Sequence, residues 1–440
     1  MFTKKTVRDI ELDGKRVLVC VDYSVPIDED GSIEDDSRIK ASLETLRYLI
    51  EHKCSLVLMS HLGRPKSPND PNTSLRPVAK HLSELIGREV QFAEDCVGDK
   101  VKVLADHLQP GQILLLENVR YHSEEEDNDP EFAKAIVEAT GAEVYVQECF
   151  GTAHRAHAST AGVPKLLPAV AGFLVEREVV TLVKAIEDPE RPLMVIFGGV
   201  KIEDKLQVLT KFIEVADFLA IGGAVANTFL KAMGVPIGTS LVDEQAGVEA
   251  AKNIIEVAQK ETAKRNFTLY LPQDVVVAKT AKPEASTRIV DLSQHAWADI
   301  NAYPKKPEAS AFEVASDEKI LDIGPFSAAF MAGVARLSKT AIWNGTMGMT
   351  EVEGLAGAAT PFGHGSRILL DGLIGSNGGE KNHPFVVAGG GDTISFIDSM
   401  PGARERFGHI STGGGASLDL LAGKELPGIA VLQDKESKND

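Results

Sequence analysis

Short apolar runs alternate with amphipathic stretches along most of the chain, and this alternation constrains the fold more than any other feature. The runs at 16–25, 55–60 and 112–119 have the composition of buried strands. Between the first two, residues 35–53 space their apolar side chains as a helix does. Strands that alternate with helices form βαβ units, so we expect a mostly parallel sheet.

The same rhythm restarts after a helical stretch over residues 173–188. One more strand pattern precedes this stretch, at 143–148. The strand patterns after it lie at 192–199, 217–223, 268–278, 340–345 and 385–391. At 440 residues the chain is long for one hydrophobic core. We therefore predict an α/β protein with two doubly wound, parallel-sheet (Rossmann-like) domains joined by a helix. Residues 281–310 and 371–384 are predicted to be surface loops, and the last nine residues a frayed tail.

Composition excludes several classes of protein. The formal net charge of −18 argues against nucleic acid or an anionic membrane as the main partner. The start has no apolar run after its lysines, and no stretch approaches the length of a membrane span. Four cysteines without CxxC spacing indicate buried thiols rather than a disulfide framework. We expect a soluble cytoplasmic protein whose partners are small molecules.

Cationic and titratable residues gather after the predicted strands of the first half. They are Arg38, His61, Arg64, Arg120, His154 and Arg155. Because the carboxyl ends of parallel strands meet at one edge of a sheet, these side chains are expected to converge there. Arginine binds carboxylates and phosphates through paired hydrogen bonds, so a pocket for a small anion is favoured. Scattered surface ion pairs are the alternative.

The segment His154–His157, HRAH, also suggests a metal site, but two features argue against it. Metalloprotease helices place their histidines four residues apart with a glutamate between, whereas here the spacing is three. In addition, Arg155 beside the first histidine would repel a divalent cation. We predict that Arg155 binds an anion, that His154 lies beside the site, and that His157 supports packing.

Glycine clusters replace the cations in the second half. Each of them follows an apolar run, at 197–201, 221–224, 343–348, 388–392 and 411–415. Glycines in such turns let backbone N–H groups approach a phosphate, with a helix N-terminus behind them. Tight strand-to-helix turns are the alternative for any one cluster. No Walker-type or strict dinucleotide motif is present in the sequence.

Three charged residues accompany these glycines. Lys201 and Lys205 are spaced to share one helix face and to reach one anion, or else to pair with Glu203 and Asp204. Asp392 follows three glycines and is suited to hold Mg²⁺ against a nucleotide phosphate. It could equally serve as the N-cap of the helix that follows.

Taken in order, the motifs SHLGRPK, LLLENVRYHSEEEDNDPEFAK, FGTAHRAHAST, GGVKIEDK, WNGTMG, GGGDT and STGGGASL resemble those of the phosphoglycerate kinase family. The resemblance covers nearly the whole chain. It implies phosphoryl transfer between 1,3-bisphosphoglycerate and ADP, giving 3-phosphoglycerate and MgATP. It also implies a monomer with a 3-phosphoglycerate-binding domain over 1–172, an interdomain helix over 173–188 and a nucleotide-binding domain over 189–405. Residues 406–440 would return to the first domain, with STGGG at a hinge.

The resemblance also implies roles for individual residues. The acid site would comprise Asp22, Tyr23, Ser24, Arg38, His61, Leu62, Gly63, Arg64, Arg120, His154 and Arg155. The nucleotide site would comprise Gly199, Lys205, Gly223, Ile320, Asn344, Glu351, Gly390, Gly391, Asp392 and Thr393, with Asp392 as the Mg²⁺ ligand. Catalysis would depend on Arg38, Lys201, Lys205, Gly391 and Gly414.

The chain departs from the family pattern at a few positions. In the acid site these are Cys20, Ser24, Gln147 and Glu148, and in the base pocket they are Ala224, Ile320 and Thr346. Two alternatives therefore stay open. One is a related carboxylate kinase with an altered nucleotide or acid preference, and the other is a non-catalytic relative. Assays with 3-phosphoglycerate and several nucleotides distinguish among the three.

Overall fold

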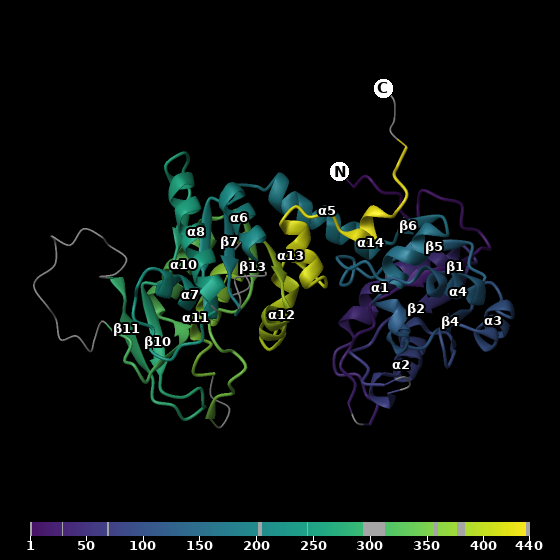
Figure 1. The fold of residues 1–440 in the computed structure, drawn as a ribbon, viewed down its shortest axis with the longest axis horizontal. Helices are drawn as coiled ribbons and strands as arrows, with labels where there is room; N and C mark the ends of the chain where they lie inside the picture. Colours follow the sequence, from purple (N-terminus) through teal and green to yellow (C-terminus); the bar gives the residue numbers. More distant parts are fainter. Residues whose placement is uncertain are drawn as a thin grey trace, which may run out of the picture. The chain divides into compact units, whose positions relative to one another are not determined.

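The chain forms two compact units in the computed structural model. The model describes residues 2–28, 30–67, 70–200, 205–243, 245–293, 313–355, 360–375 and 383–436. Unit 1 comprises Met1–Thr181 with Gly415–Leu420 and Lys424–Asp440, and unit 2 comprises Leu182–Gly414 with Leu421–Gly423 (Figure 1). Helix α5 (Phe173–Glu187) contains the boundary between them. The chain passes from unit 1 to unit 2 at residue 182 and returns to unit 1 at Gly415, apart from the three residues Leu421–Gly423.

Unit 1 is built on a sheet of six parallel strands. They are β1 (Arg16–Cys20), β2 (Ser55–Met59), β3 (Val90–Phe92), β4 (Ile113–Leu115), β5 (Val144–Gln147) and β6 (Ala169–Ala171). Their order is β3-β4-β2-β1-β5-β6, and every neighbouring pair is parallel. The predicted doubly wound parallel sheet is therefore confirmed in this half.

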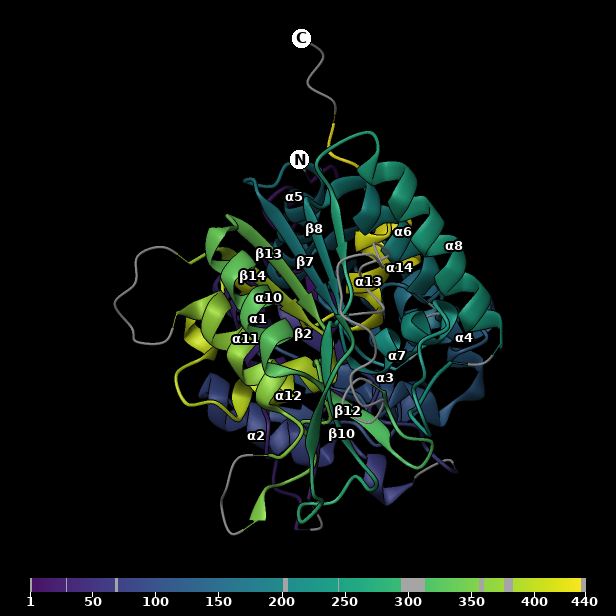
Figure 2. The ribbon, with the colours of Figure 1, turned by 90° about the vertical axis from the view of Figure 1, so that its left-hand side faces the viewer.

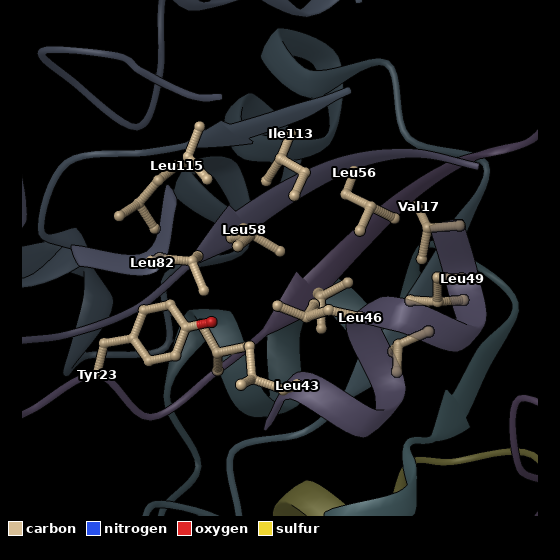
Figure 3. Close-up of a cluster of buried hydrophobic side chains, with 14 of the residues drawn as sticks. Val17, Tyr23, Leu43, Leu46, Leu49, Leu56, Leu58, Leu82, Ile113 and Leu115 are labelled. Carbon is tan, nitrogen blue, oxygen red and sulfur yellow. The ribbon is translucent and has the colours of Figure 1, made fainter. Parts of the chain in front are cut away.

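The core of unit 1 fills the space between this sheet and helices α1 (Ser37–Glu51) and α2 (Arg76–Ile86). Alternate strand residues point toward the helices, as Figure 3 shows for Leu56, Leu58 and Leu115. Leu46 of α1 and Leu82 of α2 meet them with no exposed surface. Burying a leucine contributes roughly 1.5–3 kcal/mol, so this layer fixes the strands whose ends carry the polar residues.

The remaining elements of unit 1 include α3 (Asp99–Asp106) and α4 (Pro130–Thr140). The side chain of Asp129 accepts a hydrogen bond from the Phe132 N–H at 2.8 Å and so caps α4. Gly141 ends the helix in the left-handed conformation, at φ 57°. Short helical turns complete the unit: η1 (Pro71–Thr73), η2 (Val119–Tyr121), η3 (Ser123–Glu125), η4 (Ala158–Gly162) and η5 (Val163–Lys165).

The C-terminal segment contains helices α13 (Gly415–Leu421) and α14 (Pro427–Ala430). Its backbone forms hydrogen bonds with residues that precede α5 in unit 1. The Gly428 N–H donates to the Ala153 carbonyl at 2.9 Å. The Gln433 N–H donates to the Ala169 carbonyl at 2.9 Å. Residues at the two ends of the sequence thus complete one unit.

Unit 2 repeats the architecture with a second sheet of six parallel strands. They are β7 (Leu193–Phe197), β8 (Phe218–Ile221), β9 (Thr268–Tyr270), β13 (Thr340–Asn344), β14 (Phe385–Gly389) and β15 (His409–Ile410). Their order is β15-β14-β13-β7-β8-β9. Strands β7, β8 and β9 succeed one another toward one edge of the sheet, and β13, β14 and β15 succeed one another toward the opposite edge. The strand order therefore reverses between β7 and β13.

Helices cover both faces of this second sheet. They are α6 (Leu206–Val215), α7 (Gly223–Ala232), α8 (Gln245–Thr262), α10 (Pro325–Leu337), α11 (His364–Ile374) and α12 (Gly391–Asp398), with the turn η10 (Arg404–Arg406). Figure 2 shows α10 and α11 on one face and α6 and α8 on the other. Trp343 is fully buried on the α10 face, and Phe197 packs edge-on against Phe212 of α6 on the other.

One strand prediction was wrong. Residues 268–278 form two strands in different sheets, β9 in the large sheet and β10 (Asp274–Ala278) in a small antiparallel sheet with β11 (Arg288–Asp291) and β12 (Lys319–Ile323). Pro272 lies between them and has no N–H to donate to a ladder, so a continuous strand is disfavoured there. Strand β11 also lies within the predicted loop 281–310. Residues 294–310 and 376–382, in the two predicted loops, lie outside the described residues.

Candidate active site

Asp22 and Arg38 form the best-defined polar contact at the ligand edge of unit 1. Asp22 follows β1 and Arg38 is the second residue of α1. The Arg38 Nη1 donates to both carboxylate oxygens of Asp22, at 3.0 and 2.9 Å. The Asp22 side chain is 7% exposed and the Arg38 side chain 40% exposed. The buried carboxylate therefore orients a guanidinium that remains open to a ligand.

Asn118 and Arg120, which follow β4, fix the loop after β2. Asn118 accepts a hydrogen bond from the Leu62 N–H at 3.2 Å and donates to the Leu62 carbonyl at 2.8 Å and the Thr73 carbonyl at 2.9 Å. Arg120 Nη1 donates to the Gly63 carbonyl at 2.8 Å. The sequence predicts Arg120 as a ligand but does not indicate the positioning role of Asn118, although both lie in the motif LLLENVRYHSEEEDNDPEFAK.

The electrostatics around Arg120 suit an anion. Burial lowers the pKa of the Arg120 guanidinium, against the opposing effect of Glu126, and the positive charge of Arg155 lowers it further. The Glu126 carboxylate lies 3.3 Å from Arg120 Nε but is itself half exposed. A bound phosphate or carboxylate would offset the unfavourable effect of the Arg155 charge on Arg120.

His154 and Arg155 lie side by side in the turn after β5. Arg155 is exposed, and its Nε donates to His154 Nε2 at 3.4 Å, which leaves the ring proton on His154 Nδ1. That Nδ1 is buried and has no hydrogen-bond partner among the described residues. Burial lowers the pKa of His154, and the neighbouring Arg155 charge lowers it further. The neutral form of His154 is thus favoured beside the exposed guanidinium of Arg155.

His157 lies deeper, at the start of η4. Its Nδ1 is 3.7 Å from the buried Glu125 carboxylate, and burial lowers its pKa to about 4, with Arg120 as the next cause. Ser159 donates to the same carboxylate through its N–H at 2.9 Å and its hydroxyl at 2.6 Å. His157 therefore belongs to a buried polar network that supports the turn.

The other predicted acid-site residues differ in accessibility. His61 and Ser24 are partly exposed and Arg64 is exposed, and the Ser24 hydroxyl accepts a hydrogen bond from the Gly63 N–H at 3.4 Å. Leu62 is buried. Tyr23 has no exposed surface: its ring lies in the core (Figure 3), and its hydroxyl is 3.0 Å from that of Ser42. The Tyr23 side chain therefore packs beneath the site, which leaves its backbone as the part that could contact a substrate.

Cys149 was not singled out in the sequence, yet its buried thiol lies under this edge. It hydrogen-bonds with Cys20 and with His61, and these contacts lower its pKa against the effect of burial. The Thr152 hydroxyl is 2.9 Å from the Cys149 sulfur. Nothing in the local sequence indicated this contact, because Cys20 and Cys149 are brought together only when β1 pairs with β5.

Unit 2 contains a pocket of about 360 Å³ at the carboxyl ends of its strands. The predicted nucleotide residues that line it are Gly199, Gly223, Ile320, Glu351 and Asp392. Ala224 and Thr346, where the chain departs from the family pattern, also line this pocket, as does Ile320. The pocket adjoins the reversal point between β7 and β13, where open α/β sheets bind ligands.

Glycines allow the strand ends around this pocket to approach closely. A Cβ on Gly345, which has φ +93°, would lie 2.3 Å from the carbonyl carbon of Gly198. A Cβ on Gly223, at φ +59°, would lie 2.9 Å from the Gly199 nitrogen and from the Thr346 carbonyl oxygen. Side chains at these positions would displace the backbone groups that face the pocket.

Residues around the start of α12 divide into two layers. Thr393 and Asn344 are buried, and the Thr393 hydroxyl accepts a hydrogen bond from the Gly345 N–H at 2.7 Å. Gly391 and Asp392 are exposed in the first turn of α12. The N-cap residue is Gly390, so Asp392 does not cap the helix as the alternative had it. Its carboxylate is instead an exposed oxygen donor at the pocket.

The predicted cationic groups of unit 2 are only partly described. The Lys205 ammonium lies 5.2 Å from the centre of the Phe197 ring and close to Gly199, at 3.0 Å from the position that a Cβ would take there. Lys201 lies outside the described residues. Gly414 has φ +50° and open space around its Cβ position.

Asp322, at the floor of the pocket, was not predicted. It accepts hydrogen bonds from the Gly365 N–H at 2.8 Å and the Ile323 N–H at 2.9 Å. Burial raises the pKa of this carboxyl to about 7 despite these donors. The group joins β12 to the start of α11 and fixes one wall of the pocket.

Comparison with known proteins gives one consistent result. The family model described as phosphoglycerate kinase matches residues 7–424. The phosphoglycerate kinase of Moorella thermoacetica is 44% identical over 434 residues, covering 99% of this chain and 100% of the relative. That of Aquifex aeolicus is 44% identical over 438 residues with the same coverage.

Solved structures agree with the sequence relatives. The phosphoglycerate kinase structure from Coxiella burnetii has a TM-score of 0.77 at 34% identity and covers 97% of this chain and 98% of its own. The one from Pyrococcus horikoshii has a TM-score of 0.78 at 28% identity, with 98% of both chains covered. Among the described residues, no helix combines the length and the apolar character needed to cross a bilayer.

Proposed function

We propose, from the premise that this chain belongs to the phosphoglycerate kinase family, that it transfers a phosphoryl group reversibly between 1,3-bisphosphoglycerate and ADP. The products are 3-phosphoglycerate and MgATP, so the chain is a phosphotransferase with a carboxyl acceptor. The observation that carries the proposal is the family match along nearly the whole chain. Two chemically distinct ligand edges, one cationic and one rich in glycine, support it.

The acid is proposed to bind at the cationic edge of unit 1. Arg120 and Arg155 would hold its phosphate, with Arg64 and His61 alongside. This assignment is supported by the lowered pKa of the Arg120 guanidinium, caused by burial and also by the Arg155 charge, and by the exposure of Arg155. Asp22 would orient Arg38 through their two hydrogen bonds, leaving Arg38 to face the carboxyl end of the acid.

The nucleotide is proposed to bind in the pocket of unit 2. Support comes from the close approach of Gly199 and Gly223, from Glu351 on the pocket wall, and from the helix N-terminus at Gly391. Lys205 would neutralise phosphate charge beside Gly199. Lys201 is proposed to act with it, on the strength of the GGVKIEDK motif.

The chemistry requires no general base. In either direction the nucleophile is already anionic, as a carboxylate or as the β-phosphate of ADP. The barrier comes from charge spread over the moving phosphoryl group, which Arg38, Lys205 and backbone N–H groups would neutralise. Because an acyl phosphate hydrolyses readily, water must be excluded while the two substrates are in contact.

Mg²⁺ is expected to accompany the nucleotide. The exposed Asp392 carboxylate is an oxygen donor of the kind that Mg²⁺ prefers, and it lines the pocket, so the residues fit the ion. When bound, the ion would supply positive charge to the nucleotide phosphates. We further propose that the protein is a cytoplasmic monomer, which its four free, buried cysteines and the family resemblance support. Sedimentation velocity tests the oligomeric state.

A coupled assay tests the activity. The purified chain is given 3-phosphoglycerate, Mg²⁺ and one of ATP, GTP or another nucleoside triphosphate, and product formation is followed. Turnover with ATP is expected. Absence of turnover with every nucleotide would contradict the proposal, whereas a preference for GTP would show that Ala224, Ile320 and Thr346 have remodelled the base pocket.

A further inference from the structure

Three potential metal ligands lie together beyond the carboxyl ends of the edge strand β3 and its neighbour β4, and none of them was assigned to the acid site. Asp95 and Cys96 follow β3, and His122 follows η2 after the neighbouring strand β4. One ligand atom from each lies within 4.8 Å of the other two. No other group of three such residues in the described part of the chain meets this criterion.

The cluster is held in place by its own contacts. Asp95 Oδ1 is 2.8 Å from His122 Nε2 and accepts a hydrogen bond from the Cys96 N–H at 2.7 Å. The His122 ring stacks on Phe132 of α4, with ring centres 5.0 Å apart. These contacts orient the carboxylate and the imidazole ring toward each other before any ion binds.

The surroundings of Cys96 suit a cation. Its side chain is buried, and its backbone N–H donates to the Asp95 carboxylate that would share the ion. A divalent ion at that point would bind the sulfur of Cys96 and the neighbouring carboxylate together.

The geometry needs only small adjustments. Zinc binds sulfur, nitrogen and oxygen at distances that place tetrahedral ligands roughly 3.3–3.6 Å apart. The His122–Asp95 pair would open slightly from 2.8 Å, and the remaining separations, at most 4.8 Å, would close. Asp95 is half exposed, so its side chain is free to rotate as these separations adjust.

We propose that Asp95, Cys96 and His122 bind one zinc-class divalent ion, with water as the fourth ligand. On binding, the Cys96 sulfur forms a bond to the metal and releases its proton to solvent. The proton on His122 Nε2 moves to Nδ1, so Nε2 can bind, and no electron is transferred. The ion ties the segment after β3 to the segment that carries Arg120. A thiolate and an imidazole select zinc over Mg²⁺, so this site differs from the one at Asp392.

Cobalt(II) provides the test, because a thiolate ligand gives it a characteristic charge-transfer absorption. The full chain is freed of metal with a chelator and titrated with Co²⁺, then with Zn²⁺ as competitor. We expect one equivalent of thiolate-bound cobalt, displaced by Zn²⁺ and retained in excess Mg²⁺. Calorimetry of Zn²⁺ binding at pH 8 in two buffers is expected to show release of about one proton.

Variants assign the ligands. Cys96→Ser is expected to remove the charge-transfer band and to weaken Zn²⁺ binding by about 100-fold or more. His122→Gln, at a partly exposed residue, gives the same loss of affinity and answers the question if Cys96→Ser does not fold. Cys54→Ser, at another buried cysteine, is the matched control and is expected to bind as the parent does. Absence of the band in the parent, or equal affinity in the parent and both ligand variants, would overturn the proposal.

Discussion

The two units share one architecture but prepare their ligand edges by different means. In unit 1 the edge consists of arginine and histidine side chains, each held by a neighbour, as Asp22 holds Arg38. In unit 2 the edge consists of backbone at Gly198, Gly223 and Gly345, where strand ends approach too closely for a Cβ. The same type of sheet therefore offers side-chain charge on one unit and backbone dipoles on the other.

The difference follows from what each edge has to hold. A small acid with a phosphate and a carboxyl group has few atoms, and guanidinium groups meet each of them with paired hydrogen bonds. Long side chains lose conformational freedom when they bind, so the hydrogen bonds that hold them in advance reduce that cost. A nucleotide presents a chain of phosphates, which successive N–H groups follow well. Truncating side chains should therefore impair turnover or acid binding at the edge of unit 1, and adding Cβ atoms to glycines should impair nucleotide binding at the edge of unit 2.

Arg38→Ala is expected to have the largest effect. Its charge would act on the transferring group, so kcat should fall by about 1,000-fold while KM for 3-phosphoglycerate changes little. Steady-state kinetics in the coupled assay measures both constants. Arg177→Ala is the matched control, because Arg177 is also ion-paired and similarly exposed in unit 1. Unchanged turnover in Arg38→Ala would show that the catalytic assignment is wrong.

Glu148→Gln probes the buried support of unit 1. Burial raises the pKa of Glu148 from 4.5 to about 8, although Thr45 and Leu174 donate to its carboxyl. The folded state keeps this proton up to about pH 8 while the unfolded chain releases it near 4.5, so the free energy of unfolding falls as pH rises between those values. Over this pH range the free energy of unfolding of Glu148→Gln should therefore fall by about 2–4 kcal/mol less than that of the parent.

Urea unfolding of both proteins across that pH range measures the difference. The parent and Glu148→Gln should be closest in stability at low pH and should diverge as the pH approaches 8, with the variant the more stable. Parallel stability curves for the two proteins would contradict the raised pKa.

Gly223→Ala tests the backbone edge of unit 2. Its Cβ would lie 2.9 Å from Gly199 and Thr346 backbone atoms at a left-handed φ, so the pocket wall has to move. We expect KM for ATP to rise about 30-fold, equivalent to ~2 kcal/mol, with KM for 3-phosphoglycerate unchanged. Gly333→Ala on α10, where the Cβ meets open space, is the control. Equal nucleotide affinity in both variants would count against a glycine-built site.

Arg155→Ala should have the smallest effect of the four. The side chain is exposed and bonds only to His154 among the contacts described here, so its loss leaves the unit intact. Removal of one charge-assisted contact to phosphate should raise KM for 3-phosphoglycerate about tenfold. Titration of 3-phosphoglycerate binding by calorimetry checks this value, and unaltered affinity would remove Arg155 from the acid site.

Periodicity in the sequence was sufficient for the fold class, because buried parallel strands and amphipathic helices have distinct patterns. The periodicity gave a wrong strand at 268–278, because this apolar run contributes strands to two different sheets and only Pro272 indicates the break between them. The small antiparallel sheet was missed for a related reason. Strand β12 pairs with β10 although the two are far apart in the sequence, and no local pattern indicates such pairing.

Some residues of the candidate sites could be predicted from the sequence, and others could not. Residues at strand ends, such as Arg38 and Asp392, follow from the rule that parallel sheets bind ligands at their carboxyl edge. Residues that support the site were missed. Asn118 acts through backbone groups of a distant loop, and Asp322 through the first turn of a helix, so their roles depend on tertiary contacts. Tyr23 shows the converse, since a motif residue beside the site points into the core.

The return of the C-terminal segment to unit 1 sets an order on the synthesis of the protein. The Ala153 carbonyl, one residue before His154, receives its hydrogen bond from the Gly428 N–H. A ribosome has made the whole of 182–414 before it reaches that partner. A nascent chain can thus complete its second sheet while the turn carrying Arg155 still lacks its support. The acid site, encoded among the first residues to be translated, is among the last parts of the molecule to be finished.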